Sequence, residues 1–171
     1  TKMKKLILLS ILLIVGCAPV VLSDFPSYND TTGKFIYEDV VQVDEGNSAD
    51  ILFDKLHQWI ALNYNSANNV IQLNDKVNPK LIVKGNFSTN VLGVKESWYP
   101  HTIELKAKDG RFKYTITVHR YKDVNNEMAF NSSSLGFKNK IYADVDIKVK
   151  STIASMTHHV KVEKLNQNDD G

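Results

Sequence analysis

The fold is decided by residues 102–119, which read TIELKAKDGRFKYTITVH. On both sides of a central Lys-Asp-Gly-Arg link, apolar and polar side chains alternate, and this period of two is typical of half-buried β-strands. Asp109-Gly110 predicts a type I′ turn, because these residue types tolerate the positive φ that matches the twist of a hairpin. We therefore expect two antiparallel strands with one apolar and one polar face.

Counting outward from the turn gives the register of this hairpin. On the apolar face the expected pairs are Ala107 with Phe112, Leu105 with Tyr114, and Ile103 with Ile116. On the polar face the expected pairs are Lys106 with Lys113, Glu104 with Thr115, and Thr102 with Thr117. A slip by one residue would expose the whole apolar set, so the pattern allows one register.

On the N-terminal side of the hairpin, periodicity predicts strands at 35–43, 70–74 and 81–87 and one amphipathic helix. Ser48 is a suitable cap for the start of this helix. Its apolar residues recur at helical spacing, and the polar residues between them are expected on the solvent side. The apolar set is Leu52, Leu56, Trp59, Ile60 and Tyr64, and the polar set is Asp50, Asp54, Lys55 and Gln58.

On the C-terminal side, residues 121–140 are polar and predict a long loop, with buried anchors at Met128, Phe130, Leu135 and Phe137. A second amphipathic helix is expected from Ile141 to Val160. The order strand, helix, four strands, helix predicts an α+β fold in which two helices cover one face of an antiparallel five-stranded sheet. The expected single domain is 34–165, followed by a disordered tail at 166–171.

Length and charge restrict the possible function. The chain has 171 residues, 43% of them hydrophobic, and a formal net charge of +2, which fits one globular domain. Without Lys2, Lys4 and Lys5, the 21 basic residues fall to 18, against 19 acidic residues. A nearly neutral body lacks the broad positive field that attracts nucleic acid, so no nucleic-acid partner is expected.

The first 16 residues predict a lipoprotein signal peptide. The apolar run from Leu6 to Val15 is too short to span a bilayer, which needs about 20 apolar residues. Ile14-Val15-Gly16-Cys17 resembles the lipobox of bacterial lipoproteins, in which the Cys is lipidated. The resemblance implies cleavage before Cys17 and attachment of acyl chains such as palmitate, each buried CH₂ contributing about 0.8 kcal/mol to membrane binding. The alternatives are an ordinary signal peptide with an incidental Cys and an uncleaved anchor.

The segment after this leader is expected to be a tether. Cys17 is the only cysteine, so the body has no internal disulfide. Ala18 stands where Asp is the familiar signal for retention at the inner membrane, so we expect an outer-membrane lipoprotein. The sequence does not predict which leaflet of that membrane carries it. Residues 17–33 lack periodicity and predict a flexible tether. Within it, Asp30-Thr31-Thr32 resembles the O-glycosylation sequon of Bacteroidota envelope proteins.

Several short stretches together resemble a known family. They are Trp59-Ile60, Tyr64-x-Ser66-Ala67-x-x-Val70-Ile71-Gln72, Gly85, and Lys108-Asp109-Gly110-Arg111-Phe112. They are similar to a family of Bacteroidota envelope proteins described as a domain of unknown function with a TBP-like fold. The resemblance covers about Phe35 to Val118 and implies that topology, but it implies no catalytic residue and no DNA binding.

The sequence contains no recognisable catalytic or metal-binding motif. Asp54 and His57 share one helix face, but a metal site in such a setting needs a second pair of ligands. His158 and His159 are adjacent and point in different directions on a helix, so we expect them at a solvent edge. No Gly-x-Ser-x-Gly or phosphate-cradling loop is present. We therefore predict no catalytic residue, no cofactor and no metal.

Two surfaces are candidates for contact with a ligand or partner. Trp98 and Tyr99 precede the hairpin in an expected loop, where their rings either stack on a sugar or protein partner or close one end of the core. The polar sheet face either binds a polar ligand or is simply solvated; its residues include Glu104, Lys106, Lys113 and Thr115.

The combined expectation is a lipid-anchored cell-envelope protein that binds or assembles with an envelope protein or glycan and is not an enzyme. One alternative is a lipoprotein that binds a small ligand or glycan through Trp98, Tyr99 and the polar face. The other alternative is a small hydrolase whose site is assembled from dispersed residues.

Overall fold

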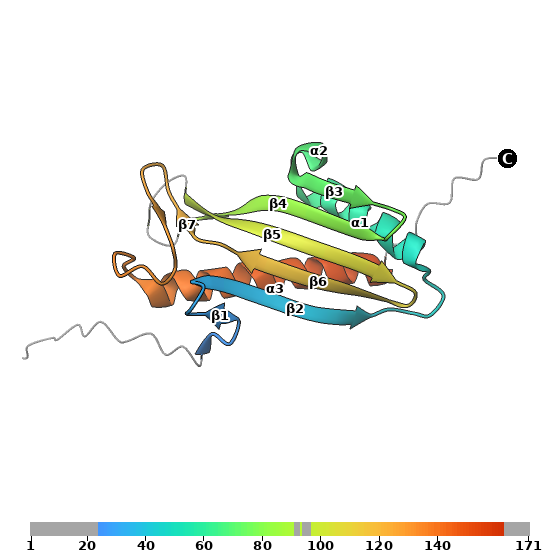
Figure 1. The fold of residues 1–171 in the computed structure, drawn as a ribbon, viewed down its shortest axis with the longest axis horizontal. Helices are drawn as coiled ribbons and strands as arrows, with labels where there is room; N and C mark the ends of the chain where they lie inside the picture. The colour runs from blue at the N-terminus through green and yellow to red at the C-terminus, as the bar shows by residue number, and fades with distance from the viewer. Residues whose placement is uncertain (1–23, 91–92, 94–96, 163–171) are drawn as a thin grey trace, which may run out of the picture.

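The computed structural model describes residues 24–90, 93 and 97–162. Its two long helices pack on one face of an antiparallel sheet, and the other face is open (Figure 1). The strands are β1 (Tyr28–Asn29), β2 (Lys34–Gln42), β3 (Ile71–Asp75), β4 (Lys80–Thr89), β5 (Ser97–Lys108), β6 (Arg111–Val118), β7 (Tyr121–Lys122) and β8 (Glu127–Met128). The helices are α1 (Ala49–Asn63), the short α2 (Ala67–Val70) and α3 (Lys138–Val162). No helix within these ranges is long and apolar enough to cross a bilayer.

The predicted α+β architecture is confirmed, but the number of strands is larger than expected. Among the described residues the sheet has eight strands, in the order β1-β2-β6-β5-β4-β3, with β7 beside β5 and β8 beside β7. The five predicted strands are β2 to β6. The three additional strands have only two residues each, which is too short to show an alternating pattern.

The hairpin register is confirmed at every predicted pair, from Ala107 opposite Phe112 to Thr102 opposite Thr117. The predicted type I′ turn is wrong, because only Gly110 has a positive φ (68°) and Asp109 does not. Instead, the Asp109 side chain is fixed by the neighbouring helix: its Oδ1 accepts a hydrogen bond of 2.8 Å from the backbone N–H of Ala49. The turn therefore also holds the start of α1.

Helix α1 begins where the sequence predicts. Ser48 Oγ accepts a hydrogen bond of 3.3 Å from the backbone N–H of Ile51, and the predicted apolar residues from Leu52 to Ile60 are buried. Lys55 was expected in solvent but is buried, with 7% of its surface exposed. Its Nζ donates hydrogen bonds to the Val160 carbonyl at 3.0 Å and to Asn47 Oδ1 at 3.1 Å. A lysine can bury its aliphatic part in this way when its ammonium group is hydrogen-bonded.

Helix α3 covers the rest of the sheet and begins at Lys138, slightly before the predicted start. Its buried residues include the predicted Ile141, Val145, Val149, Met156 and Val160. Of the predicted loop anchors, Phe130 and Leu135 are buried and Met128 is half-buried. Phe137 is 67% exposed, because it lies in a left-handed turn (φ 53°) immediately before the helix rather than on its core face.

Part of the segment expected to be a tether belongs to the fold. Phe25 packs edge-on against Tyr142 of α3, with ring centroids 5.5 Å apart, and Tyr28 lies 4.7 Å from the same ring. Tyr28 also begins β1, which pairs with β2. Within the described residues, the ordered domain therefore starts before the predicted boundary at residue 34.

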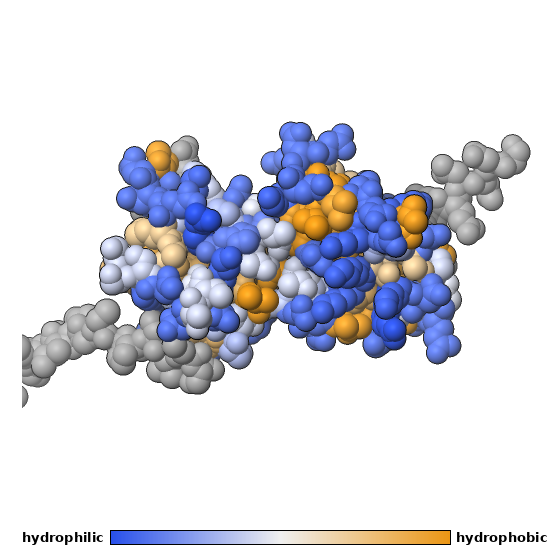
Figure 2. All heavy atoms as spheres, viewed as in Figure 1, coloured by the Kyte–Doolittle hydropathy of each residue, from blue (hydrophilic) through white to orange (hydrophobic). Residues whose placement is uncertain are grey.

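The open face of the sheet is largely hydrophilic, with small apolar patches (Figure 2). Ile36, Val40 and Leu73 are the most exposed apolar residues of its strands, each between 37% and 42% exposed. This face carries the polar rows that the alternating pattern predicts, and the helices cover the opposite face.

Candidate functional site

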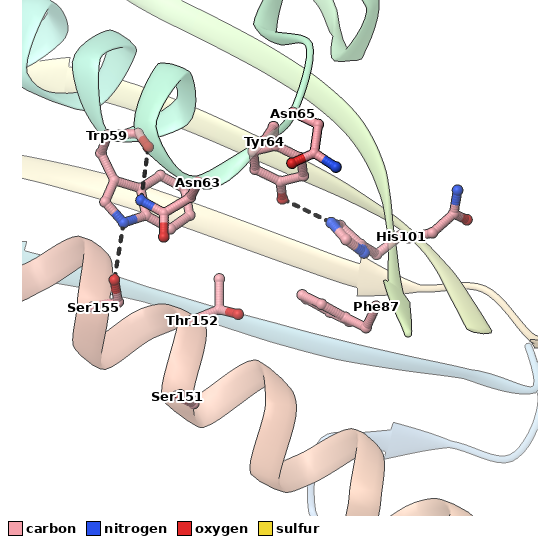
Figure 3. Close-up of a pocket in the computed structure, with 10 residues that line it drawn as sticks. Trp59, Asn63, Tyr64, Asn65, Phe87, His101, Ser151, Thr152 and Ser155 are labelled. Atoms are coloured by element: carbon pink, nitrogen blue, oxygen red, sulfur yellow. Dashed lines mark hydrogen bonds between the residues drawn. The ribbon is translucent and has the colours of Figure 1, made fainter. Parts of the chain in front are cut away.

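A pocket of about 410 Å³ lies between the end of α1, the middle of α3 and the sheet (Figure 3). We call it the Tyr64–His101 pocket. Its residues come from all three layers: Trp59, Asn63, Tyr64 and Asn65 from α1 and the residues after it, Asn86, Phe87 and His101 from β4 and β5, and Ser151, Thr152 and Ser155 from α3. The volume is in the range of small-molecule sites.

The lining of the pocket combines amides, hydroxyls and aromatic rings. None of the described residues that line it carries a carboxylate, an ammonium or a guanidinium group. Trp59 Nε1 donates to Ser155 Oγ at 3.1 Å, which connects α1 to α3 across the pocket. The side chains of Asn65 and Ser151 are exposed and make no hydrogen bond to another described residue. Asn86 alternates with Gly85 and Phe87 along β4, so its side chain leaves the sheet on the opposite face. The side chains of Asn65 and Ser151 are therefore available to a ligand.

Tyr64 and His101 form the centre of the site. Tyr64 Oη lies 2.9 Å from His101 Nε2, and Phe87 stacks on the imidazole with ring centroids 3.8 Å apart. Burial lowers the pKa of His101 to about 4 and raises the pKa of Tyr64. Both rings are therefore uncharged at neutral pH, and His101 Nδ1 is buried without a hydrogen-bond partner among the described residues.

Gly85 is what allows Tyr64 to reach His101. Gly85 lies opposite His101 on the neighbouring strand. A Cβ at this position would lie 2.5 Å from Tyr64 Cε1 and 2.9 Å from His101 Nε2, distances that side chains do not tolerate. A glycine within a strand commonly marks such a close approach. The Tyr64 ring therefore occupies the space that any other residue at position 85 would fill.

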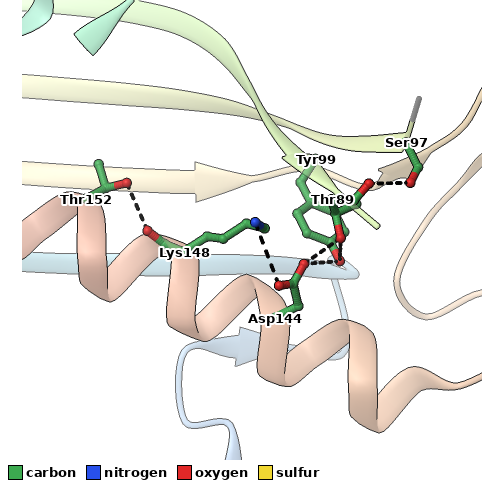
Figure 4. Close-up of polar contacts among 6 residues, drawn as sticks. All are labelled: Thr89, Ser97, Tyr99, Asp144, Lys148 and Thr152. Carbon is green, nitrogen blue, oxygen red and sulfur yellow. Dashed lines mark hydrogen bonds and ion pairs between the residues drawn. The ribbon is translucent and has the colours of Figure 1, made fainter. Parts of the chain in front are cut away.

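The two predicted contact residues do not line this pocket. Tyr99 is fully buried and offers no ring to a partner. Its Oη lies 2.9 Å from Asp144 Oδ2 and 3.2 Å from Thr89 Oγ1, and Thr89 donates to the same carboxylate at 2.6 Å (Figure 4). Lys148 Nζ lies 3.8 Å from the other carboxylate oxygen. Tyr99 thus joins the sheet to α3 and closes one end of the core.

Trp98 points to the opposite side of β5 and remains half-buried. Lys122 Nζ lies 6.0 Å from the centre of its ring. A contact role for Trp98 stays a prediction.

The other residues considered for chemistry do not converge. Asp54 forms an ion pair with Lys76 at 3.0 Å, and no group of three potential metal ligands occurs within the described ranges. His158 is exposed, as expected. His159 is buried, so the prediction that it lies at a solvent edge is wrong. Helix α3 rotates His159 towards the core while its neighbour faces solvent. Cys17 lies outside the described residues; Thr31 and Thr32 of the possible glycosylation sequon are exposed.

Sequence reasoning did not find the Tyr64–His101 pocket. The sequence predicts Tyr64 only as part of an apolar helix face, and it assigns no role to His101. One signal was available: Gly85 interrupts an apolar strand pattern, which indicates that another group approaches the backbone there. Which group approaches follows only from the three-dimensional structure.

The fold and the site together define a class of protein: a one-domain α+β protein of TBP-like fold with a single helix-bearing face. Residues 37–122, half of the chain, match the family described as a domain of unknown function (DUF4468) with TBP-like fold. The chain belongs to this family.

Solved structures show the same fold. A TBP-like protein from Parabacteroides distasonis is 12% identical, with a TM-score of 0.64 and coverage of 77% of this chain and 96% of that chain. A DUF4468 family protein from Bacteroides ovatus is 13% identical, with a TM-score of 0.54 and coverage of 81% of this chain and 96% of that chain. A comparison with curated proteins gave no match. Identities this low establish the fold and leave the activity open.

Proposed function

We propose that this chain is a non-catalytic binding protein of the cell envelope and that its Tyr64–His101 pocket holds a neutral, hydroxyl-rich small ligand such as a sugar unit of a glycan. The observation that carries this proposal is the uncharged polar lining of the pocket, with Asn65 and Ser151 free to form hydrogen bonds.

The chemistry of the lining favours such a ligand. Amides and hydroxyls both donate and accept hydrogen bonds, so they match the hydroxyl groups of a sugar. Phe87 and Tyr64 add aromatic surface for the apolar face of a ring. A charged ligand would find no opposite charge among the described lining residues and would lose its hydration without compensation.

The same lining argues against the hydrolase alternative. Glycoside hydrolysis commonly needs two carboxylates on opposite sides of the bond, and the described pocket residues include none. A pKa of about 4 also keeps His101 a weak base, because its proton affinity lies far below that of an effective general base near pH 7.

Saturation-transfer difference NMR with glucose, galactose and N-acetylglucosamine tests the proposal, with glucuronic acid as the charged counterpart. We expect at least one neutral sugar to bind and glucuronic acid to bind more weakly. The double variant Asn65→Ala/Ser151→Ala should weaken binding about tenfold, a loss of about 1.4 kcal/mol. Asn69→Ala removes an exposed amide outside the pocket and should leave binding unchanged. The absence of binding by all three neutral sugars, or an equal loss in the control, contradicts the proposal.

Membrane attachment through Cys17 is the second part of the proposal and rests on the lipobox resemblance. Attached acyl chains would hold the domain at an outer membrane, where envelope glycans are the nearest hydroxyl-rich ligands. Mass spectrometry of the N-terminus of the natively expressed protein should show a diacylglyceryl-modified Cys17. Cys17→Ser should release the protein from the membrane fraction, and an unmodified wild-type N-terminus refutes the anchor.

A further inference from the structure

The hairpin end of the open sheet face carries five cations in two successive rows, on the side of the sheet opposite the Tyr64–His101 pocket. Lys80, Lys106 and Lys113 occupy directly opposed positions on β4, β5 and β6. Two residues closer to the turn, Lys108 lies opposite Arg111. We call these five residues the basic rows.

This arrangement is unfavourable for the isolated domain, because like charges on directly opposed positions of neighbouring strands repel each other. Two carboxylates reduce the repulsion. Glu104 lies 2.7 Å from Lys106 and 3.4 Å from Lys80, and Glu38 lies 2.8 Å from Lys113. The lysines in turn lower the pKa of both glutamates, chiefly through the hydrogen bonds from Lys113 to Glu38 and from Lys106 to Glu104.

The row nearest the turn has no such compensation. Neither Lys108 nor Arg111 forms an ion pair with any carboxylate in the described part of the chain. Asp109 lies between them in sequence, but its Oδ1 already accepts the hydrogen bond from Ala49. The unpaired cations of this row therefore remain available to an anion from outside.

Two hollows meet at these cations. One, of about 660 Å³, is lined by Lys80, Lys106, Lys108 and Arg111, by Asn78 and Asp109, and by an apolar wall of Ala49, Val77, Pro79 and Ala107. Asp109 is the one carboxylate among the described residues of this lining, and its Oδ1 is occupied by the hydrogen bond from Ala49. The other, of about 210 Å³, is lined by Lys106, Lys108, Arg111, Lys113 and Val40. Lys106, Lys108 and Arg111 belong to both. The cations therefore line a concave part of the surface.

We propose that the basic rows bind a phosphate monoester, with the phosphate group at Lys106, Lys108 and Arg111 and the molecule that carries it in the larger hollow.

Phosphate fits this site better than other anions. It carries about −1.5 to −2 charges at pH 7 and three acceptor oxygens, so it can engage several ammonium groups and a guanidinium at once. A single carboxylate is satisfied by one or two lysines, as Glu38 and Glu104 already show. Neither hollow is lined by a described aromatic ring on which a nucleic-acid base could stack.

The experiment uses the complete chain and measures backbone amide shifts of Gly110 and Arg111 by NMR. The soluble probes are inorganic phosphate and glucose 6-phosphate. Co-sedimentation with phosphatidylcholine vesicles, with and without phosphatidic acid, supplies the lipid arm. We expect saturable shifts or phosphatidic-acid-dependent sedimentation. Response to the soluble probes alone assigns a soluble phosphoester, and response to the vesicles alone assigns a lipid headgroup.

Two variants with the same change in charge separate a site from general attraction. Lys108→Gln/Arg111→Gln removes the unpaired row and leaves no carboxylate without its partner, so the fold should be retained and phosphate affinity should fall at least tenfold. Lys140→Gln/Lys161→Gln removes two charges from exposed positions on α3 and should leave the affinity unchanged. Equal losses in both variants, no response to any phosphate probe, or equally tight binding of polyglutamate at the same ionic strength would overturn the proposal. None of these outcomes bears on sugar binding in the Tyr64–His101 pocket.

Discussion

The two halves of β5 are stabilised in different ways. From Thr102 to Lys108, the buried side chains are Ile103, Leu105 and Ala107, all apolar. This part pairs with β6, which follows it directly in sequence, and with β4 as far as Lys106. From Ser97 to His101, the buried side chains are Ser97, Tyr99 and His101, all polar, and their partners come from the end of α1, from β4 and from α3. The pairing of the apolar half with β6 follows from a local pattern, whereas the polar contacts of the other half form only in the completed fold.

The largest effect should come from the apolar half. Leu105→Ala removes a fully buried side chain and should lower the free energy of unfolding by about 3 kcal/mol, because the cavity adds to the lost burial. Urea denaturation measures this loss. Thr117→Ala, on the half-exposed face of β6, should cost less than about 1 kcal/mol. Similar losses in both variants would mean that the hairpin contributes little through its core face.

The polar half should give the protein an acid sensitivity that the apolar half lacks. His101 has a folded pKa of about 4, below its ordinary value of 6.5, so the unfolded chain binds the proton more readily in this range. The contribution of uncharged His101 to the free energy of unfolding is therefore complete above pH 6.5 and is lost as the pH falls towards 4. Between pH 7 and pH 4.5 the loss should be about 2 to 3 kcal/mol for this group.

His101→Phe isolates this contribution, because all other titratable groups are present in both the variant and the wild type. Urea denaturation at the two pH values should show a smaller decrease in stability for His101→Phe than for the wild type. In the wild type, the NMR signal of the His101 imidazole should show no protonation step above pH 5. A step near pH 6.5 would show that the ring is hydrated in solution.

Gly85→Ala tests the polar half of β5 by adding a methyl group without removing a hydrogen bond. The added methyl group would overlap Tyr64 and His101, so we expect a loss of about 2 kcal/mol in the free energy of unfolding and loss of sugar binding in the Tyr64–His101 pocket. Gly46→Ala is the matched control, because a Cβ there meets no described atom within 4 Å. If Gly85→Ala behaves like the control, the contact between Tyr64 and His101 is not maintained in solution.

The same division of β5 explains what the sequence could predict. Elements with a clear period, such as the hairpin and the two long helices, were located correctly because burial of apolar residues repeats along the chain. Lys55, Tyr99 and His101 were misplaced or left without a role, because each is buried with a polar partner far away in sequence. Periodicity records which positions face the core, but not which polar residue a distant element will satisfy. The contact between Tyr64 and His101 at the centre of the pocket is of this kind.

The smallest effect tests whether the polar contacts at the start of β5 act as a unit. Tyr99→Phe keeps the buried ring and removes only the hydroxyl group near Asp144 and Thr89, so the loss of stability should be about 1 to 2 kcal/mol. Combining it with Asp144→Asn in a double-mutant cycle gives the coupling between the two residues, which we expect to exceed about 0.5 kcal/mol. Additive losses would mean that the hydroxyl and the carboxylate stabilise the fold independently. Since Tyr99 joins the sheet to α3, a positive coupling would show that contact with the last helix stabilises the polar half of β5. The apolar half differs, because its buried residues already follow the alternating pattern of the hairpin with β6.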